Sequence, residues 1–133
     1  MEVSVENITK SYGFQKAVDG VSFKVHTGEI VGFLGPNGAG KTTTMKIITC
    51  FMKPDSGNVK VGGLSVLEYP TVVKKNIGYL PESNPLYKDM AIIDYLAFAA
   101  EIQGVPQHLI RERILEMINV CGLRNERHKK IAE

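Results

Sequence analysis

A glycine-rich octapeptide constrains this chain more than any other feature. Residues 35–42 read Gly-Pro-Asn-Gly-Ala-Gly-Lys-Thr, which fits the pattern of a glycine, four residues and then Gly-Lys-Ser/Thr. It follows an apolar run at residues 30–34 and precedes apolar residues that recur at helical intervals from Met45 to Met52. Because the run does not alternate with polar residues, we predict a central strand covered on both faces, followed by a helix that ends before Pro54.

This arrangement suits a phosphate group. Glycines permit a tight turn whose N–H groups point inward, and the helix start adds a positive dipole end. Lys41 can neutralise charge on the terminal phosphates, and the Thr42 hydroxyl is placed to coordinate Mg²⁺. Thr43 either reaches a more distant phosphate or serves only to begin the helix. The predicted phosphate site consists of Gly35, Pro36, Asn37, Gly38, Ala39, Gly40, Lys41, Thr42 and Thr43.

Alternating apolar and polar residues predict further strands. Residues 3–5 and 21–25 alternate, and so do residues 59–61 before the Gly62-Gly63 turn. A short apolar segment at residues 77–80 is predicted to be one more strand, ended by a proline.

Helical periodicity dominates the rest of the chain. One apolar stripe runs over residues 93–100 and is expected to stop at Gly104, and a second runs over residues 110–121 and is expected to stop at Gly122. Asp94 falls in the first turn of the first stripe. The basic residues at 124–130 are expected to form a solvated, frayed end.

Composition excludes several classes of function. With 44% hydrophobic residues and a formal charge of +2, the chain is typical of a soluble globular protein and too balanced in charge to indicate a nucleic-acid partner. No apolar stretch approaches the ~20 residues that span a bilayer, and no secretory signal is visible, which favours a cytosolic setting. Cys50 and Cys121 are far apart and are expected to be small buried side chains.

The loop alone allows a kinase, a GTPase or an ATPase. In a small kinase or GTPase the loop usually follows the first strand, whereas here alternating strands precede it. Together with Ser11-Tyr12-Gly13, this extra β layer resembles the ATP-binding subunits of ABC transporters. In that family an aromatic residue stacks on adenine and an apolar residue packs beside the base, and Tyr12 and Val18 match these two residues. Taken alone, Tyr12 would be a residue that packs at a strand end.

The resemblance extends over essentially the whole chain. Residues 54–59 fit the family's Pro-x-Ser-Gly-x-Val, and residues 77–81 lead into the place where the family has a glutamine that contacts Mg²⁺ and the attacking water. Here that residue is Glu82, which either contacts the metal through its carboxylate or is a solvated loop residue. A glutamate at this place resembles the bacterial branch that serves multidrug, antibiotic or gliding-motility exporters.

The resemblance implies an α/β fold with a P-loop core, an antiparallel β subdomain and the beginning of a helical subdomain. We expect residues 1–82 to form the β subdomain and core and residues 83–133 to begin the helical subdomain. It also implies Mg·ATP as cofactor, catalytic roles for Lys41 and Glu82, and metal contacts from Thr42 and Glu82. The implied partners are a second ATP-binding subunit, in a homodimer, and a transmembrane permease that touches residues 83–89, at the cytoplasmic face of the plasma membrane.

Three elements of the family are not found in these residues. They are the Leu-Ser-Gly-Gly-type signature, the switch histidine and a strand ending in Asp-Glu, all of which lie carboxyl-terminal in the family. We therefore expect a domain truncated before the signature, which binds nucleotide weakly and does not turn it over alone. Two alternatives stay open: a soluble ABC-type ATPase of translation or DNA repair, and a P-loop small-molecule kinase.

Overall fold

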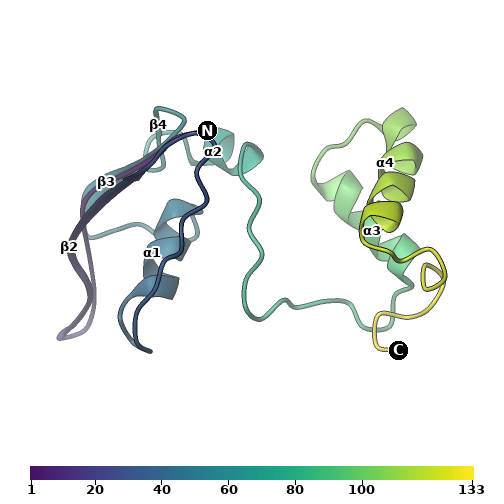
Figure 1. Cartoon of the computed structure of the whole chain (residues 1–133), viewed down its shortest axis with the longest axis horizontal. Coiled ribbons are helices and arrows are strands. Elements are labelled where there is room, and N and C mark those ends of the chain that lie inside the picture. The colour runs from purple at the N-terminus through teal and green to yellow at the C-terminus, as the bar shows by residue number, and fades with distance from the viewer. The chain divides into compact units, whose positions relative to one another are not determined.

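The computed structural model describes all 133 residues, which divide into two compact units, Met1–Tyr79 and Leu80–Glu133. Figure 1 labels the helices and strands of each unit. None of the helices combines the length and the hydropathy needed to cross a membrane.

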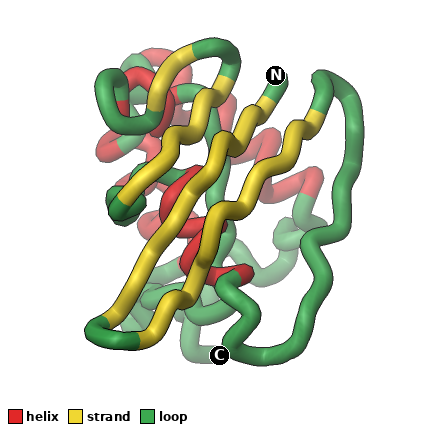
Figure 2. Tube along the Cα trace, turned by 90° about the vertical axis from the view of Figure 1, so that its left-hand side faces the viewer, coloured by secondary structure: helices red, strands yellow, loops and turns green.

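The first unit is built on a four-stranded antiparallel sheet. Strands β1 (Val3–Tyr12) and β2 (Gln15–Val25) form a hairpin, and β3 (Ser56–Val61) continues into β4 (Leu64–Ser65) through the Gly62-Gly63 turn. The order across the sheet is β2-β1-β3-β4, so β1 is paired on both sides (Figure 2). The strands predicted from alternation at residues 3–5, 21–25 and 59–61 are therefore confirmed.

Helix α1 (Lys41–Ile48) packs on one face of this sheet and closes the core. The inward side chains of alternating strand positions meet Ile47, which has no exposed surface. Burying apolar surface of this kind contributes about 25 cal/mol per Å² to stability. The buried core comprises Val5, Ile8, Val18, Ile47, Val59, Val61, Val66 and Val73.

The predicted central strand at residues 30–34 is not formed. This segment has no strand hydrogen bonds, and Ile30 and Leu34 are 102% and 92% exposed. A strand exists only with a hydrogen-bonding neighbour, and no segment, not even the edge strands β2 and β4, pairs with residues 30–34. The prediction of a strand at residues 77–80 is wrong for the same reason, since no segment pairs with it.

Helix α1 is shorter than its apolar periodicity predicts. It ends at Ile48 because Cys50 adopts the left-handed conformation, with φ of 58°, and the Phe51 N–H donates to the Lys46 carbonyl at 2.8 Å. The expectation that both cysteines are buried is also wrong, since Cys50 is half-buried and Cys121 is exposed.

A short helix, α2 (Pro70–Lys75), was not predicted from the sequence. Six residues are too few to show helical periodicity, although a proline in the first turn is typical of a helix start. Val73 is its buried residue and joins the core of the first unit.

The second unit is a pair of helices, α3 (Ile92–Ile102) and α4 (Gln107–Val120), as the two apolar stripes predict. Gly104 and Gly122 follow the helices with φ of 72° and 69°, which confirms them as stops. Asp94 lies in the first turn of α3, as expected. The buried side chains of this unit are Ile110, Ile114 and Ile118 of α4.

The basic segment at residues 124–133 is exposed but not frayed. The Arg127 and Lys129 carbonyls accept hydrogen bonds from the Ile93 and Ile92 N–H groups, both at 3.0 Å. These N–H groups open α3, which has no side-chain cap, so the last residues of the chain supply the acceptors that a helix start requires.

Candidate functional site: the glycine-rich loop and its neighbours

The loop at residues 35–40 takes its shape from its glycines. Gly38 and Gly40 have φ of +85° and +80°, a region that L-amino acids with side chains rarely adopt. A turn forms inside the loop, where the Ala39 N–H donates to the Pro36 carbonyl at 3.2 Å. These two glycines are therefore required by the backbone itself.

Gly40 also lies directly against strand β2. A Cβ at this position would be 2.1 Å from the Ala17 carbonyl oxygen and 3.0 Å from Cγ2 of Val18. Val18 is only 4% exposed, so most of its surface supports the loop and the core. The absence of a side chain at Gly40 thus sets the distance between the loop and the sheet.

Lys41, the first residue of α1, folds back over the loop. Its ammonium donates to the carbonyls of Gly35 and Pro36 at 2.5 and 2.7 Å. An ammonium has three donors, so one remains for an incoming acceptor. The positive charge is consequently held at the loop by the loop's own backbone.

The first turn of α1 presents donors that no protein group satisfies. The first hydrogen bond of the helix joins the Thr44 N–H to the Gly40 carbonyl at 2.8 Å, and the N–H groups of Lys41, Thr42 and Thr43 have no acceptor. Thr42 is exposed and Thr43 is half-buried, whereas Thr44 is 2% exposed and belongs to the interior. Unpaired donors, a helix dipole and an ammonium at one place form a site suited to a phosphate chain.

Tyr12 lies at the end of β1, beside the hairpin turn to β2. It is 51% exposed, and its hydroxyl donates to Sδ of Met52 at 3.3 Å. Residue Lys10 is opposite Val18 in the hairpin, so Tyr12 lies two residues, roughly 7 Å, beyond the level at which β2 meets the loop.

A further contact near Tyr12 was not predicted from the sequence. Asp55 pairs with Lys10 at 2.6 Å and accepts the Ser11 N–H at 2.8 Å. The Lys10 ammonium, and then the Ser11 N–H, hold the pKa of the Asp55 carboxyl below its usual value. The sequence offered one signal for Asp55, its place in the Pro-x-Ser-Gly segment. A contact across 44 residues leaves no local sequence pattern, however, so the contact itself could not be predicted.

The structure therefore gathers Tyr12, Val18 and residues 35–43 in the first unit, while Glu82 lies in the second unit. Glu82 is exposed and makes no hydrogen bond to another residue. Its contact with a metal stays a prediction.

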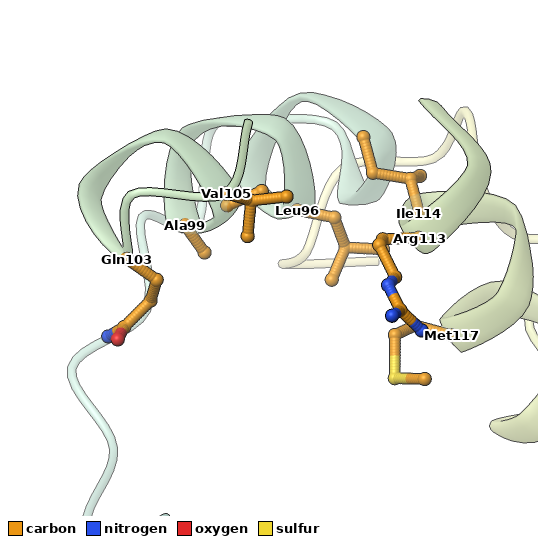
Figure 3. Close-up of a pocket in the computed structure, with 8 residues that line it drawn as sticks. Leu96, Ala99, Gln103, Val105, Arg113, Ile114 and Met117 are labelled. Atoms are coloured by element: carbon orange, nitrogen blue, oxygen red, sulfur yellow. The ribbon is translucent and has the colours of Figure 1, made fainter. Parts of the chain in front are cut away.

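The second unit contains a hollow of about 300 Å³ between α3 and α4 (Figure 3). Its lining is mainly aliphatic, with Gln103 and Arg113 as its polar side chains (Figure 3). A mainly aliphatic lining does not suit a phosphate chain, so the loop of the first unit is the candidate nucleotide site. The lining residues are Leu96, Ala99, Ala100, Gln103, Val105, Arg113, Ile114 and Met117.

Comparison with known proteins decides the family. Residues 18–133 match the family described as ABC transporter. The chain belongs to the ABC transporter ATP-binding family. This membership decides against the small-molecule kinase. It agrees with a solved ATP-binding subunit of an ABC transporter, which has a TM-score of 0.83 and 27% identity over 98% of this chain and 54% of that one.

The chain is also similar in sequence to individual ABC proteins. An ABC transporter ATP-binding protein of Methanocaldococcus jannaschii is 39% identical over 99% of this chain and 46% of its own length. A second ABC transporter ATP-binding protein, YxlF of Bacillus subtilis, is 39% identical over 97% of this chain and 42% of its own length. The linearmycin resistance ATP-binding protein LnrL of Bacillus subtilis is 36% identical over 97% of this chain and also 42% of its own length. The chain thus spans less than half the length of these relatives.

Proposed function

We propose that this chain is part of the ATP-binding subunit of an ABC transporter, and that the whole protein hydrolyses Mg·ATP to drive transport. The observation that carries the proposal is the loop at residues 35–43, where Lys41 and unpaired N–H groups converge. In this proposal the loop holds the phosphates, Tyr12 stacks on the adenine and Val18 packs beside the base.

The metal belongs to the same proposal. The exposed Thr42 hydroxyl is a suitable oxygen ligand for Mg²⁺, and the Glu82 carboxylate is a second one. Lys41 and Glu82 would then act on the terminal phosphate and on the attacking water. Within these residues nothing else supplies an oriented water, so we expect the chain alone to bind nucleotide without turnover.

The proposed partners are a second ATP-binding subunit, in a homodimer, and a membrane permease that contacts residues 83–89. We assign the chain to the exporter branch because Glu82 occupies the glutamine position and because LnrL, one of its relatives, is named for resistance to linearmycin. The protein would lie on the cytoplasmic face of the plasma membrane. The boundary proposed between the core and the helical subdomain is at residues 82 and 83.

The test is Mg·ATP affinity after Lys41→Ala, measured by calorimetry. Removing the ammonium deletes a charge-assisted contact to phosphate, so we expect affinity to fall by at least about tenfold. Lys46→Ala is the matched control, since it removes an exposed lysine from the last turn of the same helix. Equal affinity of wild type and Lys41→Ala for Mg·ATP would contradict a phosphate site in the loop.

A soluble ABC-type ATPase of translation or DNA repair shares this loop. Affinity purification of the intact protein from detergent-solubilised cells separates the two functions. We expect an integral membrane protein among its partners, whereas an exclusively soluble set would favour the alternative.

A further inference from the structure

The segment that follows α1 crosses the end of β1, immediately before Tyr12. Oδ1 of Asp55 accepts from the Lys10 ammonium at 2.6 Å, and Oδ2 accepts from the Ser11 N–H at 2.8 Å. The Asp55 N–H in turn donates to the Thr9 carbonyl at 2.8 Å. One residue therefore holds three consecutive residues of β1.

At this end β1 is paired on one side only, because its pairing with β3 stops at Thr9 and Ser56. The register between β1 and β2 shifts on both sides of Lys10, and the pairing ends at Tyr12 and Gln15. Strand ends beside a turn fray unless other contacts tie them down. The Tyr12 ring has only one polar contact of its own, the one to Met52, which comes from the same segment as Asp55.

The cation of this contact is less exposed to water than the cations of the other ion pairs. The Lys10 side chain is 20% exposed. The cations of the other ion pairs are more exposed: Lys60 is 44% exposed, and the rest are about half exposed or more. A carboxylate that accepts from both an ammonium and a backbone N–H uses both of its oxygens, which fixes its orientation.

We propose that Asp55 is a positioning residue for Tyr12: it holds the end of β1 so that the aromatic ring is presented to the base of the bound nucleotide. This inference rests on the proposed function, because it needs a nucleotide in the loop and its base on Tyr12. Asp55 acts through β1 and touches neither base nor phosphate. Its effect is therefore confined to the part of the affinity that the base supplies.

The experiment compares Mg·ATP with Mg·tripolyphosphate, which carries the phosphate chain without a base. Affinities for both are measured in wild type and in Tyr12→Ala, Asp55→Ala and Asp55→Asn. Asp19→Ala is the control, since it removes another exposed ion pair of the same hairpin, that with Lys16. Circular dichroism melts establish that each variant is folded.

We expect wild type to prefer ATP and Tyr12→Ala to lose about tenfold in ATP affinity, as loss of base stacking would give. Asp55→Ala should lose about fivefold for ATP and nothing for tripolyphosphate. Asp55→Asn should fall between, because its amide oxygen still accepts the Ser11 N–H. Combining Asp55→Ala with Tyr12→Ala should add no loss to that of Tyr12→Ala, because both act on one contact.

Two patterns would overturn the inference. In one, Asp55→Ala weakens ATP and tripolyphosphate equally, which indicates a general structural role. In the other, Tyr12→Ala weakens ATP and both Asp55 variants do not. These differ from failure of the proposed function, in which wild type binds neither compound or Lys41→Ala has no effect. If Asp55→Ala does not fold, Asp55→Asn and Lys10→Met provide the same comparison.

Discussion

The loop unit, Met1–Tyr79, and the helical unit, Leu80–Glu133, use contacts between distant segments for different purposes. In the loop unit Gly40 approaches Ala17, and Asp55 binds Lys10, across long stretches of sequence. In the helical unit α3 and α4 are neighbours joined by a short turn, and the distant residues Arg127 and Lys129 cap the start of α3. In the loop unit the close approach of distant segments shapes a polar site, whereas in the helical unit the packing of two neighbouring helices leaves an apolar hollow.

The largest expected effect tests this dependence on close approach. Gly40→Ala should destabilise the loop unit by at least about 3 kcal/mol, because the new Cβ would lie 2.1 Å from the Ala17 oxygen at a positive φ. Nucleotide affinity should be lost with it. Urea denaturation and calorimetry measure the two effects.

Gly104→Ala is the control for this change. Gly104 also has a positive φ, of 72°, but a Cβ there meets nothing within 4 Å. We expect only the strain of the left-handed conformation, about 1 kcal/mol, with unchanged affinity. Equal losses in the two variants would show that the approach of the loop to β2 contributes nothing.

The next effect concerns the core of the helical unit. Ile118 is 1% exposed, and Ile118→Ala should lower the free energy of unfolding of this unit by about 2–4 kcal/mol through a cavity. Because the loop and its contacts lie in the first unit, Mg·ATP affinity should not change.

Val120→Ala, at a residue 75% exposed on the same helix, is the matched control and should be nearly neutral. If Ile118→Ala reduced nucleotide affinity as strongly as Gly40→Ala, the contrast between the two units would be wrong.

The smallest effect concerns ion pairs. Arg113 and Glu116 pair at 2.8 Å on α4 with both side chains about half exposed or more. Water screens such a pair, so Glu116→Ala should change the melting temperature by no more than about 1 °C and leave affinity unchanged. Asp55→Ala, in contrast, should lower the affinity for ATP. If Glu116→Ala and Asp55→Ala had the same effect on that affinity, the proposed positioning role of Asp55 would be wrong.

Patterns of short range could be predicted from the sequence. The helices that stop at Gly104 and Gly122 follow from their apolar stripes, and the paired strands follow from alternation. The glycine-rich loop is a third such case, since the spacing of its glycines from Lys41 is itself local. These features express backbone preferences within a few residues.

Features that depend on a distant partner could not be predicted. The apolar run at residues 30–34 has strand composition but no neighbour, and composition cannot show whether a neighbour exists. Likewise no local pattern places Asp55 at Ser11, or shows that Val18 lies beneath Gly40. The early end of α1 depends on Cys50 adopting a conformation that cysteine rarely takes.

Amide NMR spectra recorded during a Mg·ATP titration test the central claim most directly. The N–H groups of Lys41, Thr42 and Thr43 lack acceptors, so their resonances should shift most, together with those of the loop glycines and Tyr12. Resonances of α3 and α4 should stay in place. Shifts concentrated around the hollow between α3 and α4, with the loop unchanged, would contradict a phosphate site in the loop.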